Sequence, residues 1–177
     1  RLAAMTGGEN FAKYQHIFGF GQKTNIDLPG EADTSALIFP AEEMRSSNLA
    51  TNSFGQNYNC TMIQMAAAFA SAINGGNYYE PHIVKQILNE EGAVEKKIEP
   101  VLVRETVSEN TSAFLKQALE KTVSEGTGSA AQVAGYEVGG KTGTAEKYPR
   151  SAKNYLVSFV GFAPADNPQV MVYVVID

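Results

Sequence analysis

The sequence predicts an α+β fold in which helices cover an antiparallel sheet. Helical patterns come first along the chain and three consecutive strand-like runs come last, at residues 138–145, 155–163 and 170–176. Only short polar connections separate these runs, and short links join antiparallel neighbours. We therefore expect a C-terminal three-strand meander with the helices packed against one of its faces.

The first helices are predicted from aromatic spacing and from proline. Phe11, Tyr14 and Phe18 follow the i, i+3, i+7 spacing of an amphipathic helix that ends at Gly19. Pro40, with two glutamates directly behind it in the first turn, predicts that a second helix begins there. The chain between these helices is expected to be a loop with a turn at residues 27–30.

Capping signals predict the next two helices. Thr61 and Gln64 form a T-x-x-Q capping box before a helix that is apolar nearly all round and should be well buried. Residues 74–76, Asn-Gly-Gly, end that helix. Ser108 caps a last helix, which Gly126 ends. Between the two helices, residues 83–88 and 94–98 predict a hairpin around a turn at 89–92.

The composition excludes several classes of function. The chain has 177 residues, of which 44% are hydrophobic and 19% charged, as in ordinary globular proteins. A net charge of −5 gives no basic surface, so no nucleic acid partner is expected. Cys60 is the only cysteine and there are two histidines, so we expect no disulfide, no metal site and no cofactor. No apolar run is long enough to span a membrane.

Both ends of the chain suggest an excerpt. It begins at Arg1 without methionine, and it stops at Asp177 directly after an apolar run. A domain rarely ends inside its own core strand. We therefore expect residues 1–177 to be truncated at both ends.

One segment matches the phosphate-loop pattern G-x-x-x-x-G-K-[ST], from Gly135 to Gly140-Lys141-Thr142. A phosphate loop needs a buried strand entering it and a helix leaving it. Here a glycine- and alanine-rich segment enters, and Pro149 follows within eight residues of the lysine. A nucleotide-binding module is therefore the alternative, and a strand is the favoured interpretation.

As a strand, the same residues suit peptide chemistry. Side chains alternate along a strand, so the hydroxyls of Thr142 and Thr144 share one face and can hold a carboxylate. Gly143 between them allows a ligand or backbone to approach closely. At a sheet edge, free backbone groups pair with an extended peptide, and the Thr144 N–H serves as an oxyanion donor. A plain edge strand whose Lys141 only discourages aggregation is the simpler interpretation.

Several segments in series resemble class B penicillin-binding proteins. Lys-Thr-Gly is one of the motifs of that family, and here it lies within Gly-Gly-Lys-Thr-Gly-Thr-Ala-Glu at residues 139–146. The resemblance implies a penicillin-binding/β-lactamase-like transpeptidase fold, of which residues 1–177 would be the C-terminal portion of one domain. The other matching segments are residues 8–11, 26–31, 53–56 with Thr61 and Gln64, 125–128 and 159–164.

The resemblance also implies a function. Such proteins cross-link peptidoglycan: a serine attacks a D-Ala-D-Ala stem peptide, and β-lactam antibiotics acylate the same serine. By position, Lys141 and Thr144 would be catalytic, and Thr142, Gly143 and Thr144 would bind the substrate. Further implications are a location on the outer face of the bacterial cytoplasmic membrane, through an anchor outside this chain, and partners among cell-wall synthesis proteins.

The chain departs from the family pattern in two respects, the nucleophile motif and the S-x-N element. No serine is followed three residues later by lysine, so the nucleophile motif S-x-x-K is absent. Residues 46–48 and 108–110 both spell S-x-N, but neither lies where the family keeps that element. We therefore expect the isolated chain to form no acyl-enzyme. A relative that keeps the scaffold only as a non-catalytic interaction domain is a second alternative.

Overall fold

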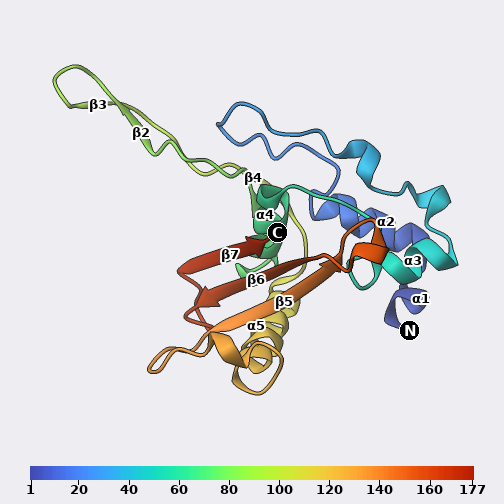
Figure 1. Cartoon of the computed structure of the whole chain (residues 1–177). Helices are drawn as coiled ribbons and strands as arrows, with labels where there is room; N and C mark the ends of the chain where they lie inside the picture. Colours follow the sequence, from blue (N-terminus) through green and yellow to red (C-terminus); the bar gives the residue numbers. More distant parts are fainter.

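The computed structural model describes residues 1–177, which form five α-helices and seven β-strands joined by loops and short 3-10 turns (Figure 1). The helices are α1 (Leu2–Thr6), α2 (Gly8–Ile17), α3 (Ser46–Asn52), α4 (Met62–Ile73) and α5 (Glu109–Ser124). The strands are β1 (Asn77–Tyr79), β2 (Gln86–Leu88), β3 (Val94–Lys97), β4 (Leu102–Glu105), β5 (Gly139–Glu146), β6 (Tyr155–Ala163) and β7 (Val170–Ile176). None of the helices has both the length and the apolar character needed to cross a membrane.

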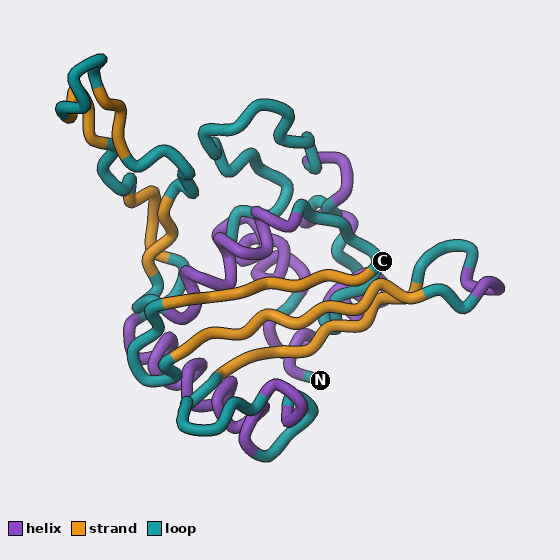
Figure 2. The backbone as a smooth tube through the Cα atoms, turned by 60° about the vertical axis from the view of Figure 1, so that its left-hand side comes forward, coloured by secondary structure: helices purple, strands orange, loops and turns teal.

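The C-terminal strands form the predicted antiparallel meander, in the order β5-β6-β7. Helices α4 and α5 pack against one face of this sheet, behind the strands in Figure 2. On the opposite face Val172, Val174 and Ile176 of β7 are 57%, 49% and 67% exposed. The α+β class and the helix-covered sheet are therefore confirmed, with one sheet face left largely bare.

Phe162 of β6 is the centre of the core between sheet and helices. It is 2% exposed and packs with Ile73 of α4 and with Ala165. Phe69 and Leu119 of α4 and α5 close over this cluster, with the Phe69 and Phe162 ring centroids 6.1 Å apart. One aromatic side chain thus joins α4, α5 and the meander.

Helix α4 begins with the capping box that its sequence predicts. The Gln64 N–H donates to the Thr61 hydroxyl, and the Thr61 N–H donates to the Gln64 side chain. The expectation of a well-buried apolar helix is only partly met, because Met62 is 52% exposed and polar Gln64 and Ser71 are the most buried residues. Gln64 also hydrogen-bonds Thr34 and donates to the Gln22 carbonyl. It thereby ties α4 to the loop between α2 and α3.

The helix predicted to begin at Pro40 is wrong in its start and extent. Residues 41–43 form only one 3-10 turn, and α3 begins at Ser46. Met44, with ψ near 58°, breaks the helical path between them. Its side chain is 4% exposed and packs with Ala12 and Leu49, so burial of this methionine overrides the local signal.

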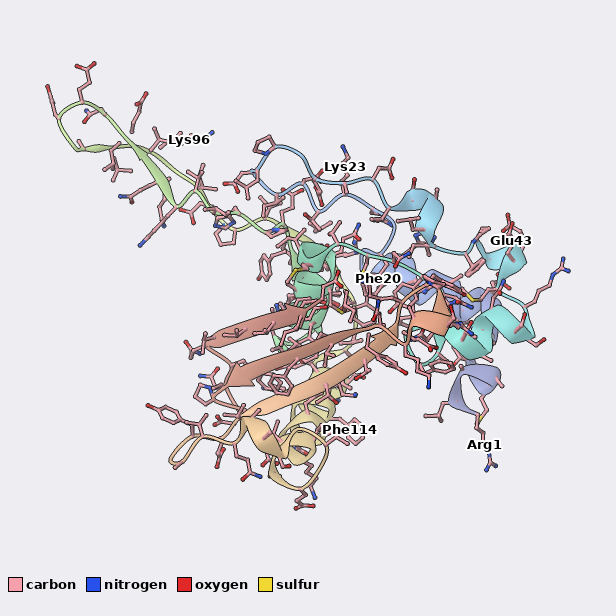
Figure 3. The ribbon with its side chains drawn as sticks, viewed as in Figure 1. Arg1, Phe20, Lys23, Glu43, Lys96 and Phe114 are labelled. Atoms are coloured by element: carbon pink, nitrogen blue, oxygen red, sulfur yellow. The ribbon has the colours of Figure 1, made fainter.

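The predicted hairpin exists as β2–β3 and projects from the body of the molecule (Figures 1 and 3). All residues of its two strands are exposed, and the labelled Lys96 lies far from the sheet. The short β1–β4 pair at the hairpin's base was not predicted. Tyr78 is buried there, with the Arg104 guanidinium 4.5 Å from its ring centroid.

Asp27 ties the predicted turn at residues 27–30 to the base of this hairpin. Its two carboxylate oxygens accept hydrogen bonds from the N–H groups of Ile83 and Val84, both at 2.8 Å. These bonds, that of Val84 foremost, hold the pKa of Asp27 below its ordinary 3.8, because they stabilise the charged form.

We expect the Asp27→Asn variant to loosen the hairpin base. An amide offers one accepting oxygen and turns an NH₂ donor toward the other N–H. Hydrogen exchange at the Val84 amide should therefore be faster in the variant. The pKa of Asp27 is lower in the folded than in the unfolded protein, so its hydrogen bonds stabilise the fold at pH values above the unfolded pKa. This stabilisation is lost as pH falls below about 4. Asp33→Asn is the matched control, because Asp33 accepts only from Ser35 within its own turn. Equal protection of Val84 in both variants would contradict this role.

Candidate active site

Strand β5 presents the four motif residues at the edge of the meander. It pairs with β6 along its whole length, from Gly139 opposite Phe162 to Glu146 opposite Tyr155, and no strand lies on its other side. The strand continues beyond Thr142 to Glu146, so no helix N-terminus follows the lysine. The phosphate-loop alternative therefore lacks the helix that nucleotide binding requires.

Two glycines at the start of β5 place it against aromatic rings. A Cβ on Gly140 would lie 2.5 Å from Cζ of Phe159, and one on Gly139 would overlap the Phe162 ring. Both glycines are buried, so the rings of β6 occupy the space that side chains of β5 would fill. The backbone that leads into Lys141 is held in this way.

Thr142 and Thr144 line the same cavity, as their alternation along the strand predicts. The cavity has a volume of about 380 Å³ and lies between β5, β6, β7 and the loop that follows α5. No charged side chain lines it. The side chains of Thr127, Thr142 and Thr144 bring hydroxyls to it, whereas the Ser158 hydroxyl lies on the opposite face, beside Gly143. The rest of the lining is mainly apolar, with Val157, Phe159, Val174 and Ile176, so an anionic group meets hydroxyl donors only beside the threonines.

Lys141 and Gly143 point to the other side of the strand. The Lys141 ammonium is exposed and donates to the Thr142 carbonyl at 2.7 Å. A Cβ on Gly143 would lie 2.5 Å from the Ser158 hydroxyl oxygen. Close approach of the neighbouring strand is thus a reason for this glycine, in addition to the ligand access that the sequence suggests.

The structure also places the residues that sequence reasoning set aside. Ser46-Ser47-Asn48 opens helix α3, and the Ser108 hydroxyl caps α5 by accepting from the Thr111 N–H at 3.2 Å. Burial raises the pKa of the lone Cys60 thiol to about 11, so this side chain stays a protonated thiol at neutral pH.

Sequence reasoning did not assign Thr127 to the site. Its hydroxyl lies 3.4 Å from that of Thr142, although fifteen residues separate them. The Gly-Thr-Gly at residues 126–128 was a signal, because glycines on both sides of a polar residue mark a tight loop. Only the packing of that loop against β5 reveals what the threonine faces.

Comparisons with known proteins agree with this arrangement. The family model described as the penicillin binding protein transpeptidase domain matches residues 1–177. The chain is 45% identical over 180 residues to Stage V sporulation protein D of Bacillus subtilis, which covers 99% of this chain and 28% of that protein. It is 33% identical over 181 residues to the probable peptidoglycan D,D-transpeptidase PenA of Neisseria meningitidis, at 100% and 29% coverage.

A solved structure gives the same result. Penicillin binding protein 3 of Mycobacterium tuberculosis, crystallised with ampicillin, superposes with a TM-score of 0.88 at 30% identity. The match covers 99% of this chain and 41% of that one. The chain thus spans less than a third of the length of these two curated relatives. The resemblance seen in the sequence is confirmed, and the chain belongs to the penicillin-binding protein transpeptidase domain family.

Proposed function

We propose that the protein containing this chain is a serine-type peptidoglycan D,D-transpeptidase and a target of β-lactams. The observation that carries the proposal is Lys141-Thr142-Gly143-Thr144 on a free sheet edge, in a chain that the transpeptidase family matches throughout. In this proposal residues 1–177 form the part of the domain that follows its nucleophile. The names of the relatives support it, since one is a D,D-transpeptidase and another binds ampicillin.

Each motif residue has a role in this proposal. The serine, outside residues 1–177, attacks the carbonyl of a D-Ala-D-Ala stem, the terminal D-alanine leaves, and an amine of a second stem takes the acyl group. The Thr142 and Thr144 hydroxyls hold the substrate carboxylate, and the Thr144 N–H donates to the oxyanion. Lys141 supports proton transfer around the serine. Gly143 keeps the strand open to the extended peptide.

Location and partners follow from that reaction. Peptidoglycan lies outside the cytoplasmic membrane, so the active domain belongs on the outer face, with an anchor elsewhere in the protein. Its partners are the stem peptide, β-lactams and other proteins of cell-wall synthesis.

A labelled penicillin tests the proposal. The whole protein should form one covalent adduct per molecule, and the isolated 1–177 chain should form none, because it has no S-x-x-K serine. The non-catalytic alternative predicts that the whole protein stays unlabelled as well. An adduct on the isolated chain would show that its nucleophile has been misidentified.

A further inference from the structure

The loop after α5 brings a third threonine to the side of the cavity where Thr142 and Thr144 lie. Thr127 and Thr142 come from different elements, yet their hydroxyl oxygens are 3.4 Å apart, a long hydrogen bond in which either oxygen can be the donor. Both side chains line the 380 Å³ cavity together with Thr144. Thr127 is exposed, so its hydroxyl is available to a ligand or to a neighbouring hydroxyl.

The loop that carries Thr127 is fixed to the end of α5. The Gly128 N–H donates to the Thr122 carbonyl at 2.9 Å, and the Gln132 side chain donates to the Val123 and Ser124 carbonyls, both at 2.9 Å. A Cβ on Gly126 would lie 2.8 Å from the Thr122 carbonyl oxygen. These contacts satisfy the last carbonyls of the helix and hold the loop beside β5.

A hydroxyl that binds a carboxylate must use its single proton for that bond. Thr142 can do so while one of its lone pairs accepts from a second donor, and the two bonds then strengthen each other. Thr127 is the only side chain that hydrogen-bonds the Thr142 hydroxyl. No charged side chain lines the cavity, so no cation there aligns the anion. The direction of the Thr142 O–H bond therefore matters more for binding the carboxylate.

We propose that Thr127 is a positioning residue, whose hydroxyl donates to Thr142 Oγ1 and turns the Thr142 proton toward the carboxylate of the stem peptide or β-lactam. The inference rests on the proposed function and extends it to a residue outside the Lys-Thr-Gly strand. It predicts an effect that depends on the negative charge of the ligand and that acts through Thr142.

The test uses the whole protein and two penicillins, one with its free carboxylate and one as the neutral methyl ester. Thr127→Val should lower the second-order acylation rate constant for the free carboxylate about 3- to 10-fold, the size of one net hydrogen bond. The rate constant for the ester should not change. Thr127→Ser, which keeps the hydroxyl, should restore the rate. Thr127→Ala should repeat the loss, and this agreement would exclude a perturbation of the loop by valine. Thr122→Val is the matched control, because the Thr122 hydroxyl bonds only within α5.

A double-mutant cycle tests whether the effect passes through Thr142. In a Thr142→Val background, Thr127→Val should have no further effect on acylation. Equal losses for both penicillins, or an additive effect in the cycle, would overturn the inference and leave Thr127 a structural residue. If the unaltered protein forms no penicillin adduct at all, the proposed function itself fails, and this inference fails with it.

Discussion

Replacing Lys141 with alanine is expected to lower the rate of acylation of the whole protein by penicillin about 10²- to 10⁴-fold. Lys141 is the one cationic residue of the motif, at the free edge of β5, where a nucleophile from outside this chain would meet the substrate. Removing its ammonium deletes a proton-transfer group and a nearby positive charge. The acylation rate constant for a labelled penicillin, measured before saturation, reports this loss.

A second lysine from the loop behind β5 is the control. Lys153→Ala also removes one positive charge, but from an exposed lysine that forms no salt bridge. It should leave the acylation rate within twofold, since exposed charges interact weakly. The role given to Lys141 would be untenable if both variants slowed acylation equally, or if Lys141→Ala were labelled at the unaltered rate. The melting temperatures of both variants should match that of the unaltered protein.

Replacing Phe162 with alanine is expected to lower the free energy of unfolding by about 3 to 5 kcal/mol. The ring is 2% exposed, contacts the cluster between sheet and helices, and lies over Gly139. Its removal leaves a cavity where α4, α5 and β5 meet, and the rigid neighbours fill it only in part. Urea unfolding of the protein, followed by far-ultraviolet circular dichroism, measures the change.

Phe114 on α5, labelled in Figure 3, provides the comparison. It is 67% exposed, so Phe114→Ala removes the same side chain from a position with little packing. Its effect should stay within about 0.5 kcal/mol. Similar losses for the two phenylalanines would mean that the structure misplaces the core.

Local sequence signals predicted the elements whose ends are set by residues close together in the sequence. The Thr61–Gln64 box sets the start of α4, and Ser108 sets that of α5, because capping needs only residues three apart. The meander followed from three consecutive strand-like runs joined by short polar connections. The strand carrying Lys141 was recognised because its surroundings lacked the helix of a phosphate loop.

Tertiary contacts decided what the sequence did not predict. The helix expected at Pro40 yields to the burial of Met44. Strands β1 and β4 have three and four residues and pair across more than twenty others, too short for a periodic signal. Thr127 meets Thr142 only after the loop folds against the sheet edge. The roles of Lys141 and the other motif residues remain predictions for the experiments above.

The rings over Gly139 and Gly140 have a consequence for drug response. Gly139 and Gly140 have no side chains of their own, so the Phe162 and Phe159 rings against them fix the path of the strand here. Substitution of either ring would shift the backbone just before Lys141, even though Phe162 is not among the residues lining the cavity. If the protein is the β-lactam target proposed above, variants with altered β-lactam sensitivity are therefore expected at interior Phe162 as well as among the residues that line the cavity.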